Sequence, residues 1–126
     1  MAKKKNRKTT THLTERALRD IAGIEKFSVR EFGRKVANRY LAKLEAAIWR
    51  ITEDPSLLRS EPDCHPWLRF YRAEKHLMVC DYQDSGRIIV LTVIYASMDI
   101  PSRLTELEPT LMAETELLHQ RLHRKK

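Results

Sequence analysis

Glycine and proline are scarce in this chain, with 3 Gly and 5 Pro among 126 residues. So few turn-forming residues argue against long linkers, low-complexity repeats and a glycine-rich phosphate-binding loop. The 2 Cys, Cys64 and Cys80, lack a CxxC spacing, so we expect no disulfide framework and a reduced, cytoplasmic compartment. No apolar run approaches the ~20 residues of a membrane span, and no apolar segment follows the basic first residues, so we expect neither a membrane segment nor a secretory signal.

The positive charge is concentrated at the two ends of the chain. The net charge is +7, from 24 basic and 17 acidic residues. Residues 1–8 contain five basic side chains and residues 121–126 contain four, with no acid in either segment, whereas residues 9–120 contain 15 basic and all 17 acidic residues. Basic ends raise non-specific affinity for nucleic acid, but they do not make the body of the protein a nucleic-acid reader.

Residues 9–26 predict a strand followed by a helix. The run TTTHL at 9–13 is rich in β-branched residues, which is typical of a strand. Thr14 is then a candidate N-cap, because its hydroxyl can accept a hydrogen bond from an early helical N–H. Apolar residues recur at helical spacing as far as Ala22, and Gly23 weakens the pattern, so we expect this helix to end by about Lys26.

A second helix is predicted over about 29–53. Ser28 and Glu31 have the S-x-x-E spacing of a capping box, and Phe27 and Phe32 occupy the hydrophobic-staple positions around it. The helix should end at Asp54, because a residue that precedes proline disfavours helical backbone. Its apolar stripe follows the i, i+3, i+4, i+7 rule and consists of Phe32, Val36, Tyr40, Leu44, Ala47, Ile48 and Ile51.

Two large apolar residues of this helix, Leu41 and Trp49, lie off the stripe and two turns apart. One interpretation is that they help to pack the first helix. The other is that they form a patch that faces a binding partner.

Three strand-like runs follow an irregular connection at 56–66. They are WLRFYR at 67–72, HLMVCDYQ at 76–83 and RIIVLTVIY at 87–95. Gly86 can adopt the positive φ of a short hairpin loop between the second and third runs. The last run is apolar on both faces, which predicts a central strand that is covered on both sides.

A C-terminal helix is predicted beyond Asp99, which can cap a helix whose first turn tolerates Pro101. Its apolar stripe is formed by Leu104, Leu107, Leu111, Leu118 and Leu122. The whole order predicts an α+β fold, in which an N-terminal helical hairpin packs on a small antiparallel β-sheet, plus a C-terminal helix. We expect a basic flexible tail at 1–8, one folded domain at 9–108 and a C-terminal helical extension with a basic end at 109–126.

The sequence offers little for metal or cofactor chemistry. His119 and His123 are four residues apart and could share a helix face, but no Cys or carboxylate completes a ligand set. A nucleophilic Cys would need a base brought to it by folding, and there is no G-x-S-x-G elbow. We therefore expect no metal site and no cofactor.

A basic cluster is the remaining candidate site. Arg69, Arg72, Lys75 and His76 lie within eight residues, and Arg103 can come near after folding. Guanidinium groups could bind phosphate and stabilise charge in phosphodiester cleavage, with His76 as the general base. The two arginines have opposite parity, however, and would face opposite sides of an ideal strand. The alternative is that these charges protect an edge strand from aggregation.

Taken in order, these segments resemble the ParE branch of the RelE/ParE superfamily, the toxins of bacterial type II toxin–antitoxin modules. The H-apolar-apolar-apolar strand and the closing MD-x-P-x-x-L make the combination specific. The resemblance implies a helical hairpin packed on a small antiparallel sheet. The matching segments are LTERALRDIAGI at 13–24, RYLAKLEAAIWRI at 39–51, EDPSL at 53–57, WLRFYRAEKHLMVCDY at 67–82, IIVLTVIY at 88–95 and MDIPSRL at 98–104.

The resemblance implies a non-enzymatic toxin with a role in plasmid stabilisation, which inhibits DNA gyrase and is neutralised by a cognate antitoxin. RelE-like members of the superfamily instead cleave mRNA on the ribosome. That activity is disfavoured here, because His76, Ala96 and Ser97 stand where RelE-like chains carry Arg or Lys. A second alternative is a non-toxic relic that retains antitoxin binding.

The candidate site residues differ between the ParE-like and the RelE-like hypotheses. For a ParE-like toxin we expect target contacts from Arg69, Arg72, His76 and Arg103, and antitoxin contacts from Leu41 and Trp49. For a RelE-like nuclease the catalytic residues would be Arg69, Arg72, Lys75 and His76. We expect no membrane partner, and a hetero-oligomer of toxin and antitoxin is compatible with both.

Overall fold

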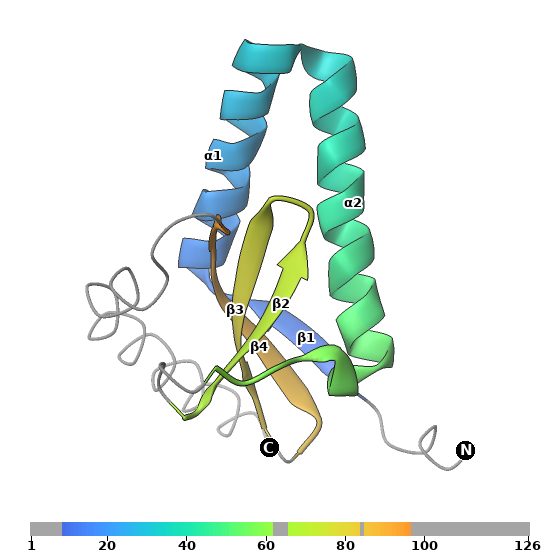
Figure 1. The fold of residues 1–126 in the computed structure, drawn as a ribbon, viewed down its shortest axis with the longest axis vertical. Coiled ribbons are helices and arrows are strands. Elements are labelled where there is room, and N and C mark those ends of the chain that lie inside the picture. Colours follow the sequence, from blue (N-terminus) through green and yellow to red (C-terminus); the bar gives the residue numbers. More distant parts are fainter. Residues whose placement is uncertain (1–8, 62–65, 84, 97–126) are drawn as a thin grey trace.

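The computed structural model describes residues 9–61, 66–83 and 85–96. Its helices and strands are arranged as a helical hairpin beside a sheet (Figure 1). In chain order they are β1 (Thr10–Leu13), α1 (Glu15–Phe32), α2 (Arg34–Glu53), the short 3-10 helix η2 (Pro55–Leu57), β2 (Leu68–Ala73), β3 (His76–Tyr82) and β4 (Arg87–Tyr95).

The predicted fold class was wrong. The first described element is a strand, β1, which forms one edge of the sheet, and both helices precede the other three strands. The sheet has the order β1-β4-β3-β2, and it is mixed rather than antiparallel, because β1 pairs with β4 in parallel. The physical reason is the long connection between these two strands, which contains both helices as well as β2 and β3 and removes the constraint that a tight hairpin would impose. The helix predicted beyond Asp99 lies outside the described residues.

The boundary between the two helices also differs from the prediction. The first helix does not end by Lys26 but continues to Phe32, so Ser28 is a buried residue inside α1 and not an N-cap. The break comes at Gly33, whose φ of 91° is a conformation that favours glycine. Its N–H still donates to the Val29 carbonyl and closes α1, and α2 begins at the next residue. The backbone requirement of the turn therefore decides the boundary, and the capping-box pattern does not.

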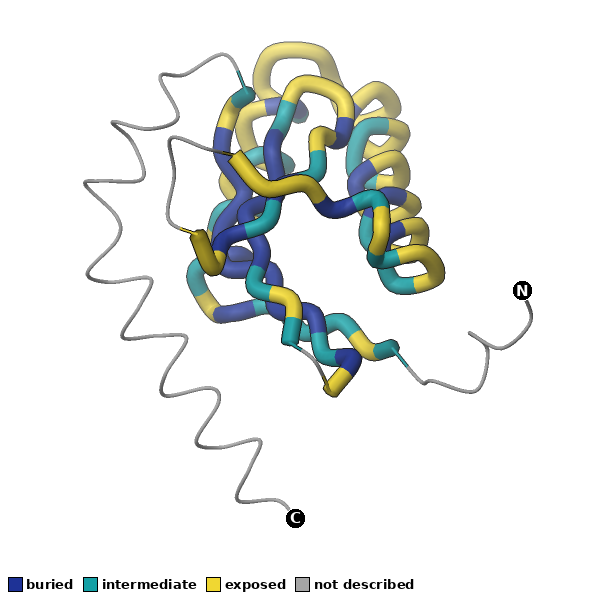
Figure 2. Tube along the Cα trace, turned by 60° about the horizontal axis from the view of Figure 1, so that its bottom comes forward, coloured by how far each residue is buried: buried dark blue, intermediate teal, exposed yellow. Residues whose placement is uncertain are grey.

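The core lies between the helices and one face of the sheet. Ala17 of α1 and Leu44, Ala47 and Ile51 of α2 pack there with buried residues from the three longer strands. A second apolar cluster forms on the other face, to which the described helices contribute no residue. The buried positions are concentrated in the strands, whereas the outer sides of the helices are exposed (Figure 2). The last strand is buried on both faces and lies inside the sheet, as its double-sided apolar pattern predicted.

Where β1 ends, Thr14 and Asp20, at the N-cap and in the first half of α1, form hydrogen bonds with the free edge of β4. The four residues of β1 pair only as far as Val90, which leaves the second half of β4 without a strand on that side. The Thr14 N–H donates to the Val90 carbonyl (3.1 Å), and the Thr14 hydroxyl donates to the Leu91 carbonyl (2.8 Å). The same hydroxyl accepts from Ala17 N–H (3.0 Å), so the predicted N-cap is confirmed.

Six residues after Thr14, the Asp20 carboxylate bonds to the next part of this edge. Its Oδ2 accepts a hydrogen bond from the Val93 N–H (3.0 Å) and one from the Thr92 hydroxyl. A buried backbone N–H without an acceptor is costly, so this carboxylate replaces the missing strand. The start of α1 is thereby fixed to the sheet.

Asp20→Ala should lower the free energy of unfolding by about 2 kcal/mol, because it leaves the Val93 N–H and the Thr92 hydroxyl without their acceptor. Glu45→Ala removes an exposed carboxylate from α2 and should change it by less than about 0.5 kcal/mol. Urea denaturation followed by circular dichroism measures both values. Equal, small effects of the two substitutions would show that Asp20 does not carry the edge of β4.

Candidate functional site

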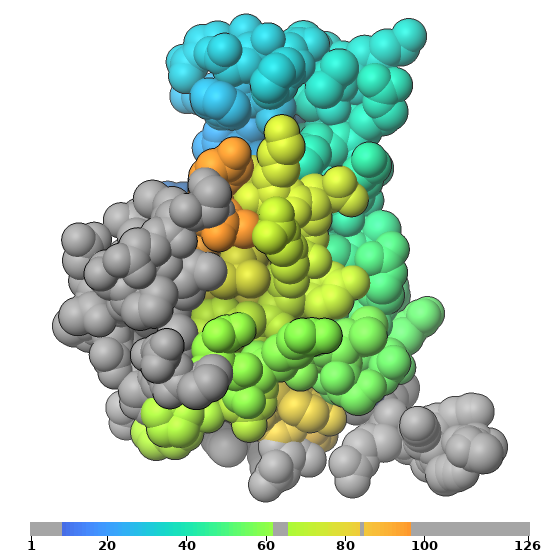
Figure 3. Space-filling view, in the orientation of Figure 1, coloured from blue at the N-terminus to red at the C-terminus, as the bar shows by residue number. Residues whose placement is uncertain are grey.

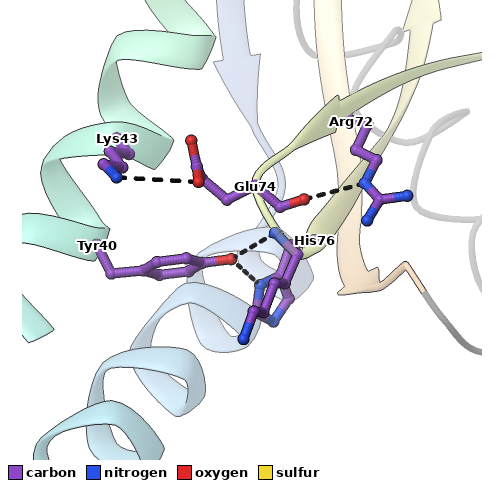
Figure 4. Close-up of polar contacts among 6 residues, drawn as sticks. Tyr40, Lys43, Arg72, Glu74 and His76 are labelled. Atoms are coloured by element: carbon purple, nitrogen blue, oxygen red, sulfur yellow. Dashed lines mark hydrogen bonds and ion pairs between the residues drawn. The ribbon is translucent and has the colours of Figure 1, made fainter. Parts of the chain in front are cut away.

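The turn between β2 and β3 brings part of the basic cluster together at one end of the sheet. Ala73 pairs with His76, so Glu74 and Lys75 form the loop, and Glu74 has a positive φ of 57°. The turn contacts α2 through Lys43, whose Nζ lies 3.9 Å from a Glu74 carboxylate oxygen (Figure 4). Both of those side chains are about half exposed, so this ion pair contributes little to stability.

Tyr40 of α2 links the helix to both sides of the turn. Its hydroxyl oxygen accepts the Lys75 N–H (3.0 Å) and lies 2.6 Å from Nδ1 of His76 (Figure 4). Since the Tyr40 oxygen accepts the Lys75 N–H, its own hydrogen is free to be donated to Nδ1 of His76, and Nδ1 then acts as the acceptor. We therefore assign the ring proton of His76 to Nε2.

The ring of His76 lies between two tyrosines. Its centroid is 5.5 Å from that of Tyr40 and 5.6 Å from that of Tyr95, both in edge-to-face geometry. Burial lowers the pKa of His76 from its ordinary value, and burial is also the largest cause that raises the pKa of Tyr40. The imidazole is thus held neutral, with Nδ1 occupied, and it presents a donor on Nε2 and no free basic nitrogen.

The arginines of the cluster do not converge on His76. Arg72 lies two residues after Phe70 and therefore faces the side of the sheet away from the helices, whereas His76 faces the helices. Its Nε donates to the Glu74 carbonyl (3.0 Å) and holds the turn. Arg69 faces the helix side near the start of β2, where its guanidinium donates to the carbonyls of Pro66 (2.8 Å) and Leu68 (3.0 Å). Arg103 lies outside the described residues.

The two residues of the predicted patch, Leu41 and Trp49, differ in their exposure to solvent. Leu41 is half-buried against the core between the helices and the sheet, which favours the packing interpretation for this residue. Trp49 is 62% exposed on the outer side of α2, which favours the partner-facing interpretation. An exposed indole on a rigid helix is a typical anchor for a protein partner.

Sequence reasoning missed the two tyrosines that enclose His76. Tyr40 was assigned to the core stripe of the helix, and its hydroxyl gave no signal of a polar partner. Tyr95 lies opposite His76 in the register of β3 and β4, but a register shift at Val79/Cys80 makes that pairing hard to count from the sequence. The signal that could have found both is a tyrosine within an apolar helix stripe and another at the end of an apolar strand, because a phenolic hydroxyl near the core needs a polar partner.

The described residues show no metal centre. They contain no group of three or more His, Cys, Asp or Glu side chains placed to hold an ion. Burial raises the pKa of the Cys80 thiol far above its ordinary value, so this cysteine is not a nucleophile at neutral pH. Within the described ranges, no helix has the length and apolar character needed to cross a membrane.

Known proteins are similar to this chain in sequence and in fold. A family model described as "ParE toxin of type II toxin-antitoxin system, parDE" matches residues 12–100. The curated protein Toxin ParE of Escherichia coli is 31% identical over 94 residues, which span 75% of this chain and 91% of that protein. The chromosomal ParDE toxin–antitoxin system from P. aeruginosa includes a chain of similar fold, with a TM-score of 0.62 at 14% identity over 71% of this chain and 97% of that chain. The family model and the E. coli relative together show that this chain belongs to the ParE family of toxins of type II toxin–antitoxin systems.

Proposed function

We propose that this toxin inhibits DNA gyrase by binding it, without cleaving RNA, and that a cognate antitoxin neutralises it. The observation that carries the non-enzymatic part is the arrangement around His76. Membership in the ParE family supports gyrase as the target, because the resemblance seen in the sequence implies it. Both partners belong to the cytoplasm, and we propose that compartment for the toxin.

A nuclease needs a base and phosphate-binding cations that face the same phosphodiester. Here Nδ1 of His76 lies 2.6 Å from the Tyr40 hydroxyl, and the ring is kept neutral by burial. Arg72 faces the other side of the sheet, and Arg69 is bonded to carbonyls at the start of its own strand. These groups are suited to holding the turn in place and to contacting a protein surface, and they are poorly placed to act together on one phosphate.

The outer side of α2 is the surface that we propose for the antitoxin. Trp49 offers a large exposed apolar side chain there, and Leu41 supports the same helix from the core side. The adjacent sheet edge, β2, is occupied at Phe70 by a two-bond bridge to Arg59. The N–H and carbonyl of Arg72, two residues further on, point to the same edge and can pair with an added antitoxin strand.

Trp49→Ala should weaken binding of the cognate antitoxin by about 30-fold, the loss expected for an interface anchor of about 2 kcal/mol. Leu18→Ala is the matched control, because Leu18 is 55% exposed and belongs to α1, outside both α2 and the β2 edge. It should change the affinity by less than about 3-fold. Isothermal titration calorimetry on the folded variants measures both, and a Trp49→Ala protein that binds as tightly as the parent would contradict the proposed surface.

His76→Gln should leave inhibition of gyrase supercoiling and of cell growth within about 3-fold of the parent, because glutamine can still accept the Tyr40 hydroxyl hydrogen while no proton transfer is required. For a nuclease, the same change would lower mRNA cleavage by about 10²-fold or more. Translation in a cell extract, with transcripts probed for cuts in the ribosomal A site, separates the two. Cuts made by the parent that vanish with His76→Gln would overturn the non-enzymatic mechanism.

A further inference from the structure

The tip of the helical hairpin carries two exposed phenylalanines. Phe27 is 52% exposed and Phe32 is 60% exposed, and their ring centroids lie 6.5 Å apart at an interplanar angle of 77°. Neither ring belongs to an apolar cluster of the core. Val36, in the first turn of α2, extends the exposed apolar surface. The sequence pattern had placed these side chains in a staple and a core stripe, where burial would have explained them.

The tip projects beyond the sheet. In Figure 1 both helices continue past the β2–β3 turn, and Figure 3 shows their joined end as a protrusion above the strands. The ring pair therefore does not contribute to the core. Burial of exposed aromatic surface of this kind against a partner would contribute favourably to the free energy of binding.

The turn at the tip is short and hydrogen-bonded to both helices. The helices meet at the single residue Gly33, whose N–H and carbonyl bond into α1 and α2. Arg34 of α2 reaches back to Glu25 of α1 with an Nη1–Oε2 distance of 2.8 Å. A docking surface that is ordered before binding loses less conformational entropy when it binds.

The charge around the rings is positive. Residues 25–39 contain five basic and two acidic side chains. Both acids already have a basic neighbour, since Glu25 pairs with Arg34 and Glu31 lies 3.9 Å from Arg30. Among the described residues, Lys26, Lys35 and Arg39 have no ion-pair partner. The surface thus combines an apolar centre with a cationic border, which is complementary to an apolar pocket bordered by carboxylates.

A protein fits this surface better than a nucleic acid. Proteins that bind single strands track the backbone along a groove and offer open aromatic faces on which bases stack. Here the rings stand on a protrusion, and the edge of one ring meets the face of the other. This geometry is suited to insertion into a pocket.

We propose that the hairpin tip inserts the Phe27–Phe32 ring pair into an apolar pocket with an acidic border on the protein that the toxin inhibits. This inference rests on the proposed function, inhibition of a protein target. It assigns the two partners to separate surfaces, because Trp49 lies 13 residues after Val36 along α2, about 20 Å at the helical rise. The antitoxin then binds the side of the hairpin, and the target binds its end.

The double substitution Phe27→Ser with Phe32→Ser tests the tip. It should weaken binding of purified gyrase by about 30-fold or more and abolish growth inhibition, while antitoxin affinity and melting temperature stay at the parent values. Leu18→Ser is the matched control, because Leu18 is an exposed apolar residue of α1 outside the tip, and it should leave all four readouts unchanged. A second variant, Lys26→Glu with Lys35→Glu, keeps the rings and should slow association with gyrase at low salt by about 10-fold.

The outcomes separate this inference from the proposed function. If the parent chain neither binds gyrase nor stops growth, the proposed function fails. If the parent does both and the double serine variant does so equally, the tip inference fails alone. Loss of antitoxin binding in that variant, or loss of binding to single-stranded DNA with gyrase binding intact, would also overturn it by assigning the tip to another partner.

Discussion

The hydrogen bonds by which α1 completes the edge of β4 are the constraint on which the rest of this structure depends. A strand of four residues cannot pair along a strand of nine, and the deficit is filled by the hydroxyl of Thr14 and the carboxylate of Asp20. These bonds fix where α1 starts and how it lies against the sheet. The position of α2, and with it Tyr40 and Trp49, follows from α1 through the turn at Gly33.

Because these bonds attach only one end of the helical hairpin to the sheet, the two ends of the hairpin differ in how many contacts they make with the strands. At the sheet end of the hairpin, Tyr40 connects α2 to the β2–β3 turn and fixes His76 between two aromatic rings. At the free end no described strand packs against the hairpin, and the two exposed rings contact each other edge to face. One end of the hairpin is specialised for internal support, and the other is available to a partner.

Local signals in the sequence predicted the elements better than their connections. The Thr14 cap, the proline that follows α2 and the apolar runs of β3 and β4 are each decided by neighbouring residues, and the structure has them at or near the expected positions. The parallel pairing of β1 with β4 joins residues that are more than 70 positions apart, and no local pattern encodes it. At Ser28 two local rules competed, and the positive φ of Gly33 overrode the capping box. For the site, strand parity correctly separated Arg69 from Arg72, whereas the contact of Tyr40 with His76 depends on the packing of α2 and could not be read from spacing.

The parallel pairing of the first and last described strands has a consequence for the synthesis of the protein. During translation β1 emerges first, but its partner β4 is among the last parts of this sheet to be made. Folding that depends on such distant contacts is slow and cannot be completed on a partial chain. A nascent or prematurely terminated toxin that lacks β4 therefore cannot join β1 to the β2–β3 hairpin, and its sheet stays incomplete. The cell that produces it therefore contains a fully folded toxin only after β4 has been translated.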